Sequence, residues 1–425
     1  MRNLQKLAAS TLEDILAGTA LHQALPQRLQ NLETAGERGA LQDIVYGSLR
    51  WLGRLDAWLE ALLQRPLTDP QLGWLLRVAL YQLAYTRAPA HAVVHNAVTA
   101  AGEGWRSGLA NAVLRNFQRR RAELDQRADA SLTGRWSHPE WWIDKLQAEY
   151  PEHWQAILQA GLTHPPFTLR VNAQHGSIDD YLQSLHAAGM PAQQTGPVAI
   201  TLDKAVAVHL LPGFAAGDVS VQDAGAQWAA PLLDVQAGQR VLDACAAPGG
   251  KTGHLLETAD VRVTALDVDA GRLSRVQENL DRLGFSAQLL QGDAAAPATW
   301  WDGKHFDRIL ADVPCSASGV VRRNPDIKWL RRHDDIAGFA RQQAAMLDAL
   351  WPLLARGGKL LYVTCSIFPE ENALQVEAFI DRQNTISRAQ RGVNEVEACP
   401  LPLTNGQILP DATHDGLFYA LLRKI

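Results

Sequence analysis

From about residue 216 onward, the sequence alternates between short apolar runs of strand length and longer stretches with helical spacing. The strand candidates are "RVLDA", "RVTALDV", "AQLLQGD", "DRILADV", "KLLYVTC" and "LFYALLR"; the clearest helix candidates are "GRLSRVQENLDRLG" and "DDIAGFARQQAAMLDALWPLLARGG". This alternation predicts a mostly parallel, doubly wound α/β sheet, and such sheets bind ligands at the carboxyl ends of their strands. We therefore expect the chemistry in the residues that directly follow each strand.

The chain of 425 residues is too long for one ordinary domain, and its pattern changes twice. Residues 1–128 space their apolar side chains at three and four, which predicts an all-α domain. Residues 129–215 mix helical stretches with the strand candidate "PFTLRVN", which predicts a small α+β region. Residues 216–425 form the predicted α/β domain.

Composition limits the compartment and the class of partner. Four scattered cysteines without a CxxC pair do not form a disulfide framework, so we expect a cytoplasmic protein. The N-terminal stretch carries Glu13 and Asp14 within its apolar pattern, unlike a signal peptide, and no apolar run is long enough to cross a membrane. The formal net charge of -5 argues against a basic coat for nucleic acid but allows local basic patches.

The stretch "VLDACAAPGGKTGHLLE" predicts a strand, a turn of small residues and a helix. It is not a P-loop, because Cys245 stands where that motif requires glycine, and it lacks the GxGxxG of dinucleotide sites. The turn still lets a ligand approach the backbone at a helix N-terminus. The residues expected around the ligand are Cys245, Ala246, Ala247, Pro248, Gly249, Gly250 and Lys251.

Carboxylates at the ends of the next strands indicate the ligand. Asp267 ends "ALDVD", where it could bind ribose hydroxyls, and Asp293 ends "LLQGD", where it could accept from an adenine amino group. Either could instead cap a helix. Together they favour an adenosine without phosphates, so S-adenosylmethionine is a better candidate than NAD or ATP.

The stretch "ADVPCSASG" places Cys315 where many amino-methylating enzymes have an aromatic ring. A thiol there favours chemistry on carbon, because a thiolate that adds to C6 of a pyrimidine makes C5 nucleophilic. Asp312 could favour the addition by sharing a proton with the ring. The target base must then be flipped out of its helix or single-stranded.

A second thiol, Cys365, follows the strand in "LLYVTCSIFPEEN". Two strand-end cysteines in one cleft could divide attack and product release between them, although burial of both as ordinary core residues is the alternative. Residue chemistry alone leaves open which thiol attacks. Cys399 has no motif around it, and we expect the backbone of Cys245, rather than its thiol, to matter.

Two basic clusters are candidates for RNA binding, although charge runs are most often solvated faces. "FQRRRAEL" contains Arg119 and Arg120, and "VVRRNPDIKWLRRH" contains Arg322, Arg323 and Lys328 around a tryptophan. His91 and His95 have zinc-like spacing but lack the glutamate of a zinc protease, so no metal site is expected.

Five motifs, "CAAPGGKT", "ALDVD", "QGD", "DVPCSASG" and "VTCSIFPEEN", resemble those of the Sun-type RNA cytosine-5 methyltransferases and occur in that family's order. The N-terminal region with "NAVLRNFQR" is similar to the NusB-like, RNA-binding extension of the bacterial RsmB (Sun/Fmu) group, which modifies 16S ribosomal RNA. The resemblance implies a Rossmann-like S-adenosylmethionine-dependent methyltransferase domain joined to an all-α NusB-like domain. Val313 and Asn324 depart from the family's usual residues, which affects fine RNA contacts rather than reactive groups.

By position, the resemblance assigns Cys365 as the nucleophile and Cys315 as the thiol that aids release, whereas DNA cytosine-5 methyltransferases attack with the Pro-Cys thiol. It also places cofactor contacts on Cys245 to Lys251, Asp267, Asp293 and Asp312. The implied partner is 16S ribosomal RNA, either naked or in an early assembly particle. The alternative from another class is an RNA-binding ribosome-assembly factor with an idle methyltransferase fold, which would bind no labelled cofactor.

Overall fold

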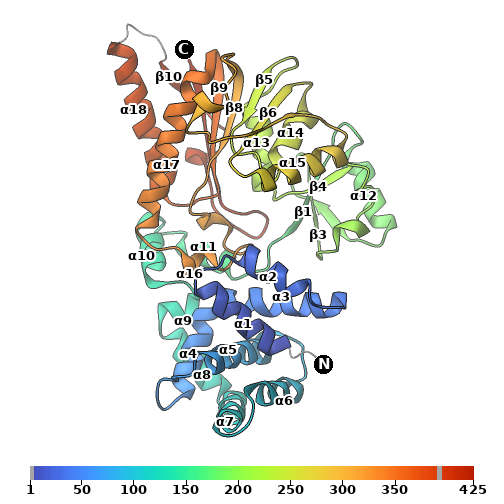
Figure 1. Ribbon diagram of the computed structural model, residues 1–425, viewed down its shortest axis with the longest axis vertical. Helices are drawn as coiled ribbons and strands as arrows, with labels where there is room; N and C mark the ends of the chain where they lie inside the picture. Colours follow the sequence, from blue (N-terminus) through green and yellow to red (C-terminus); the bar gives the residue numbers. More distant parts are fainter. Residues whose placement is uncertain (1–3, 390–394) are drawn as a thin grey trace. The chain divides into compact units, whose positions relative to one another are not determined.

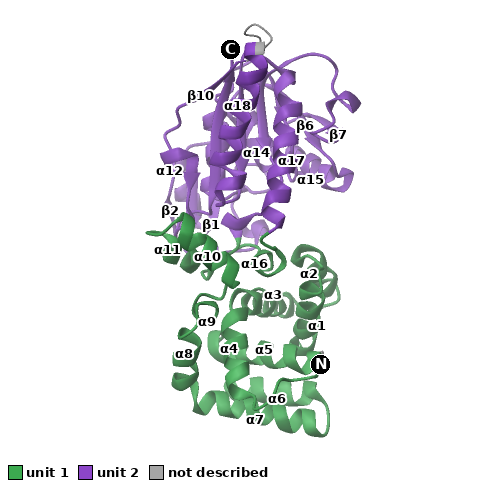
Figure 2. Ribbon diagram, turned by 90° about the vertical axis from the view of Figure 1, so that its left-hand side faces the viewer, with its two compact units in different colours: residues 1–164, 321–333 green, residues 165–320, 334–425 purple. Residues whose placement is uncertain are grey.

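The computed structural model describes residues 4–389 and 395–425, and the chain divides into two compact units (Figure 2). The helical unit contains residues 1–164 and 321–333, and the α/β unit contains residues 165–320 and 334–425. The chain thus passes from one unit to the other three times. These units cut the chain at different places from the three regions expected from sequence.

The helical unit begins with helices whose ends are set by local capping. The Thr34 side chain and Glu37 form a capping box at the start of one helix, and Asp69 with Pro70 opens another. Leu12, Trp58 and Phe117 are among the residues of an apolar core between the helices α1 to α8. The helices are α1 (Leu4–Leu16), α2 (Leu21–Leu29), α3 (Ala35–Arg50), α4 (Leu52–Leu62), α5 (Pro70–Tyr85), α6 (Ala90–Ala101), α7 (Trp105–Arg119), α8 (Arg121–Asp129), α9 (Leu132–Trp136), α10 (Glu140–Glu149) and α11 (Trp154–Gly161).

Residues 321–333 return to this unit from the far end of the sequence. They contain the short helix α16 (Ile327–Leu330), and Trp329 and Leu330 pack against the helical core. The indole nitrogen of Trp329 donates to the Leu49 carbonyl at 2.7 Å. The segment that follows the "DVPCSASG" motif is therefore part of the helical fold, which the sequence pattern did not predict.

The α/β unit opens with a small antiparallel sheet in the order β2-β3-β1-β4. Its strands are β1 (Phe167–Val171), β2 (Ala192–Gln194), β3 (Ala199–Leu202) and β4 (Val219–Val221), and α12 (Ile178–Ala187) packs on it. Arg170 of β1 is fully buried, forms an ion pair with Glu257 at 2.6 Å and donates to the Gly250 carbonyl at 2.8 Å. This arginine fixes the small sheet to the turn predicted to bind the cofactor.

The large sheet has the order β10-β12-β9-β8-β5-β6-β7, with β11 paired to β12. Its strands are β5 (Arg240–Asp243), β6 (Arg262–Asp267), β7 (Gln288–Gln291), β8 (Phe306–Asp312), β9 (Leu354–Thr364), β10 (Val396–Cys399), β11 (Gln407–Ile408) and β12 (Leu417–Lys424). The pairs within β9-β8-β5-β6-β7 are parallel, whereas β10, β11 and β12 pair antiparallel. The predicted mostly parallel sheet is confirmed.

Helices cover both faces of the large sheet. Successive residues of each strand point to opposite faces, and both sets are apolar, so each face packs against helices. Val241 and Leu310 belong to the core under α13 (Ala229–Leu233), α14 (Gly250–Thr258) and α15 (Ala270–Leu283). Leu242 and Ile309 belong to the core under α17 (Asp335–Leu350) and α18 (Ala373–Ala389) (Figure 1). The strands are thus apolar on both faces, as buried parallel strands require.

The order of the strands places a switch point between β5 and β8. After β5 the chain builds β6 and β7 on one side, and then returns to build β8 on the other side. Open sheets bind ligands outside the carboxyl ends of the strands at such a point. Within the described residues, no helix is long and apolar enough to cross a membrane.

Candidate active site

The turn after β5 brings a helix N-terminus to the switch point. The amide of Ala246 donates to the Leu266 carbonyl at 2.9 Å, and the amide of Gly249 closes the turn on the Ala246 carbonyl at 2.7 Å. Gly249 has φ +97°, and an added Cβ would lie 3.1 Å from the Val276 Cα. Only glycine meets both conditions. The first turn of α14 has no side-chain cap, so its amides can bind an anionic group.

The predicted carboxylates end neighbouring strands, but their environments differ. Asp267 is buried, and its side chain accepts hydrogen bonds from the amides of Ala247 and Asp269, both at 3.1 Å. Asp293 is exposed after β7 and accepts from the Ala295 amide at 2.8 Å. Asp267 therefore also fixes the cofactor turn. Together with the uncapped helix amides, these groups suit the hydroxyl, amino and carboxylate groups of S-adenosylmethionine.

Lys251 and Asp312 form an ion pair at the ends of α14 and β8, with 2.6 Å between Nζ and the carboxylate. Burial disfavours the ammonium, but Asp312, its hydrogen bond and the nearby Cys365 hold the pKa of Lys251 above its ordinary value. A permanent positive charge thus lies on the Cys365 side of the site.

Asp243, which sequence reasoning missed, lies beneath this pair. Its side chain is 1% exposed and accepts from the Thr252 hydroxyl at 2.7 Å. Burial, together with the charge of Asp312, raises the pKa of Asp243 to about 7. The signal in the sequence was a carboxylate in the last position of an apolar strand, directly before the small-residue turn.

The two predicted thiols lie in contact: the sulfurs of Cys315 and Cys365 are 3.4 Å apart. Cys315 follows β8 and is buried, whereas Cys365 follows β9 and is half-buried. The hydrogen bond to Cys365, burial, and the negative charges of Cys365 and Glu371 raise the pKa of the Cys315 thiol well above its ordinary value. Cys315 is thus held as a neutral thiol that can donate to its neighbour.

The other two cysteines do not form part of this thiol pair. Burial, followed by the charge of Asp312, raises the pKa of Cys245, so its thiol stays protonated. Burial also raises the pKa of Cys399, which lies on β10.

The second basic cluster requires a correction. Lys328 is fully buried in the helical unit, where its ammonium donates to the Arg50 carbonyl at 2.9 Å, and Arg322 is 2% exposed. Arg50 in turn donates to the Arg322 carbonyl at 3.0 Å. Arg323 is partly buried. Neither the Lys328 nor the Arg322 side chain is exposed for RNA in this structure; the Lys328 side chain and the Arg322 carbonyl bind segment 321–333 to Arg50.

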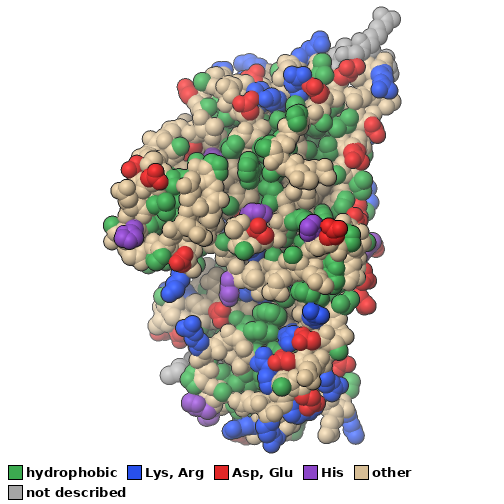
Figure 3. Space-filling model, turned by 180° about the vertical axis from the view of Figure 1, so that it is seen from behind, with side chains coloured by type: hydrophobic (Ala, Val, Ile, Leu, Met, Phe, Trp, Pro, Cys, Tyr) green, Lys and Arg blue, Asp and Glu red, His purple; other side chains and the backbone are tan. Residues whose placement is uncertain are grey.

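The first cluster lies on the surface of the same unit. Arg119 is exposed and donates to the Asn116 side chain at 2.5 Å, whereas Arg120 forms two hydrogen bonds with Glu123, at 2.6 and 2.8 Å. Lys and Arg are interspersed with Asp and Glu on the face drawn in Figure 3. His91 and His95 are exposed, and the described residues contain no group of three or more His, Cys, Asp or Glu side chains that could hold a metal.

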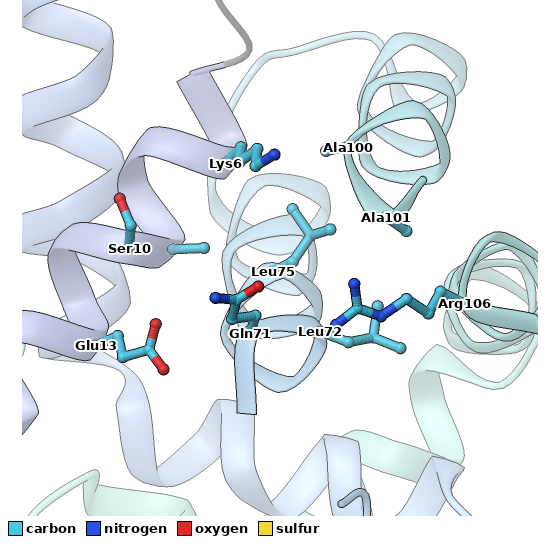
Figure 4. A pocket seen from close by; sticks show the side chains of 10 residues that line it. Lys6, Ser10, Glu13, Gln71, Leu72, Leu75, Ala100, Ala101 and Arg106 are labelled. Carbon is cyan, nitrogen blue, oxygen red and sulfur yellow. The ribbon is translucent and has the colours of Figure 1, made fainter. Parts of the chain in front are cut away.

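A small pocket of about 130 Å³ lies in the helical unit between α1, α5, α6 and the start of α7 (Figure 4). Lys6, Glu13 and Arg106 line its rim, and Leu72 and Leu75 lie among its apolar residues. Arg106 is already paired with Asp69. The pocket contains none of the residues predicted to act in catalysis or cofactor binding.

Comparison with known proteins covers the whole chain. Three family profiles match it: the 16S rRNA methyltransferase RsmB/F at residues 230–423, the RsmF/B-like ferredoxin-like domain at 138–209, and the NusB family at 2–119. The expected Rossmann-like and NusB-like folds are thereby confirmed.

Named relatives agree with the profiles. The ribosomal RNA small subunit methyltransferase B of Vibrio cholerae is 47% identical over 99% of this chain and 98% of its own length. The protein of the same name from Escherichia fergusonii is 45% identical over 100% of this chain and 99% of its own length. A solved methyltransferase homolog protein from Pyrococcus horikoshii is 27% identical with a TM-score of 0.59, covering 69% of this chain and 97% of that one.

Proposed function

The chain belongs to the RsmB/F family of 16S rRNA methyltransferases and acts on ribosomal RNA, and we propose that it methylates C5 of one cytosine in 16S ribosomal RNA with S-adenosylmethionine. The observation that supports carbon chemistry best is the contact of two thiols, 3.4 Å apart, at the carboxyl ends of β8 and β9. Transfer to an amino group needs no thiol, and a single nucleophilic addition needs only one.

The residues at the switch point fit the cofactor. The uncapped first turn of α14 would bind the carboxylate of its methionine part, and Asp267 and Asp293 would accept from the hydroxyl and amino groups of its adenosine. The cofactor supplies an electrophilic methyl group. Gly249 allows the chain to turn tightly enough to present these groups together.

In the proposed reaction Cys365 attacks. Its neighbour Lys251 carries the positive charge of the site, and Cys315 donates toward its sulfur, so the negative charge of a thiolate is better stabilised on Cys365 than on Cys315. The Cys365 sulfur bonds to C6 of the cytosine, and the electron pair of the C5–C6 double bond becomes available at C5. With S-adenosylmethionine bound, that pair would form the new C5–methyl bond, and S-adenosylhomocysteine would be the leaving group.

Release requires two further steps. A base removes the C5 proton, the pair of that C–H bond restores the C5–C6 double bond, and the Cys365–C6 bond breaks with its electrons returning to sulfur. We assign Cys315 to the second of these steps, because it is a neutral thiol in contact with the departing sulfur and can give that sulfur its proton as the bond to C6 breaks. We assign Asp312, which is paired with Lys251, to sharing a proton with N3 of the ring during the addition.

The position of the methyl group tests the proposal. Purified protein, labelled cofactor and 16S ribosomal RNA are incubated, and the digested nucleosides are separated by mass spectrometry. We expect 5-methylcytidine with wild type and none with Cys365→Ala, while labelled cofactor still binds the variant. A methyl group on nitrogen, or full activity of Cys365→Ala, would overturn the assignment; absence of cofactor binding to wild type would favour an assembly factor.

A further inference from the structure

Glu371 is a buried carboxylate that the reaction described above does not use. It ends a short 3-10 helix, Pro369–Glu371, between β9 and α18, and it is 0% exposed. A buried carboxylate is costly unless hydrogen bonds satisfy its oxygens. The donors that bind the Glu371 carboxylate therefore show which segments it holds in place.

The carboxylate accepts four hydrogen bonds, all from uncharged donors. One oxygen accepts from the Ser316 amide at 2.8 Å and from the Gln343 side chain at 3.1 Å. The other accepts from the hydroxyls of Ser316 at 2.5 Å and Ser366 at 2.6 Å. Ser316 is the neighbour of Cys315, and Ser366 is the neighbour of Cys365. One side chain thus binds both cysteine loops at the position next to each sulfur.

Other hydrogen bonds connect the two loops on either side of the thiols. Val313 donates to the Val363 carbonyl at 3.1 Å as the strands separate, and Gly319 donates to the Cys365 carbonyl at 2.9 Å beyond the thiols. Between these points lies the serine cluster: the hydroxyls of Ser316 and Ser318 are 3.2 and 3.0 Å from that of Ser366, and Ser318 accepts from the Ile367 amide at 2.8 Å. Gln343 adds a bond to the Pro314 carbonyl at 3.0 Å, on the other side of Cys315.

Charge adds a second effect to this geometry. The ionisable groups that face Cys315 are Cys365, Glu371 and the phenol of Tyr362. Glu371 is the negative charge on the Cys315 side of the pair, whereas the Lys251 ammonium acts on the Cys365 side. The charge of Glu371 therefore favours a proton on Cys315.

We propose that Glu371 is a positioning residue of the methyl transfer: its carboxylate clamps the Cys315 and Cys365 loops together, so that the two sulfurs stay in contact. The proposal rests on the function proposed above for the two thiols. It assigns Glu371 no contact with RNA or cofactor; it acts through Ser316 and Ser366.

Two variants separate the clamp from the charge. In Glu371→Gln the amide keeps an acceptor for the Ser316 amide and a donor for a serine hydroxyl, but the charge is gone. In Glu371→Ala both are lost, and four buried donors lose their acceptor. Glu377→Gln is the matched control, because Glu377 is an exposed carboxylate on α18 in the same unit.

Thiol crosslinking tests the clamp without RNA or cofactor. A diazene oxidant such as diamide takes up the two thiol hydrogens while the Cys315–Cys365 disulfide forms, and peptide mass spectrometry follows the product. We expect wild type, Glu371→Gln and Glu377→Gln to crosslink quickly, and Glu371→Ala about tenfold or more slowly. Equal rates in Glu371→Ala and wild type would overturn the clamp whether or not the protein methylates cytosine.

Alkylation tests the charge. In a Cys365→Ser background, the pH dependence of Cys315 alkylation reports the pKa of that thiol. We expect this pKa to fall in Glu371→Gln and to remain unchanged in Glu377→Gln.

The methylation assay tests the role in catalysis. Glu371→Ala should lose about 100-fold in kcat, with KM for RNA unchanged. An unchanged Cys315 pKa in Glu371→Gln, or a loss confined to KM, would contradict the proposed role. If no variant or wild type forms 5-methylcytidine but crosslinking follows the predicted order, the proposed function fails and the clamp stands.

Discussion

At the scale of single residues, the α/β unit buries several ionisable groups close to its reactive end. Asp243 lies 1% exposed under the Lys251–Asp312 pair, and its pKa is raised to about 7. Because the carboxyl group is protonated more readily in the folded protein than in the unfolded chain, it favours the folded state only while it carries its proton. That contribution is fully present below the ordinary pKa of 3.8 and is lost as the pH rises through about 7.

Asp243→Asn should therefore change the pH dependence of stability. The amide keeps an acceptor for Thr252 but cannot ionise, so the fall in stability between pH 3.8 and about 7 should be smaller than in wild type. The thermal unfolding midpoint of both proteins, measured across this range, gives the comparison. If wild type loses no stability relative to the variant as the pH rises through this window, the environment described for Asp243 is contradicted.

At the scale of elements, the turn between β5 and α14 depends on one backbone conformation. Gly249 adopts φ +97° with the Val276 backbone behind it. Gly249→Ala should cost about 1–3 kcal/mol through strain alone, and relief of that strain would displace the first turn of α14. We expect a loss of cofactor affinity, measured by calorimetry with S-adenosylmethionine.

Gly303→Ala is the matched control. Gly303 also has positive φ, but no atom lies within 4 Å of its added Cβ. Equal cofactor affinity in the two variants would refute the role of the turn.

Some elements of the fold were predictable from the sequence pattern, and others were not. β5, β6, β8 and β9 were predictable because buried parallel strands are short continuous apolar runs, and their ends marked the site. β10 and β11 were not predicted, because they are short and lie at the antiparallel edge. Glu371 was quoted in a motif without a role, because its donor Ser316 lies 55 residues away in the chain. Burial of Lys328 was contrary to expectation, because its acceptor on Arg50 lies 278 residues away.

At the scale of the whole molecule, the two units share the chain rather than follow one another. Segment 321–333 begins six residues after Cys315 but belongs to the helical unit. Within that unit the Asp326 side chain accepts from the Leu21 amide at 3.0 Å, at the start of α2, and Lys328 is fully buried. The helical unit therefore supplies the packing partners of a segment that lies between two strands of the large sheet in the sequence.

A chain that begins at residue 165 should accordingly fold poorly. It would leave Trp329, Leu330 and the ammonium of Lys328 without the helices they pack against. We expect aggregation or a lower thermal midpoint than the full chain, measured by light scattering and calorimetry. Replacing residues 321–333 of the truncated chain by a Gly/Ser linker should restore solubility, whereas a truncated chain that is soluble and fully active without the replacement would contradict this account.

The central claim is that Cys365 and Cys315 act on one cytosine in succession, and trapping the adduct tests it most directly. Cys315→Ala is incubated with labelled S-adenosylmethionine and 16S ribosomal RNA and then separated on a denaturing gel. We predict a covalent protein–RNA complex that carries the label, absent from wild type and from the Cys315→Ala, Cys365→Ala double variant. An adduct that accumulates in Cys365→Ala instead would reverse the two roles, and no adduct in any variant that still methylates RNA would contradict the mechanism.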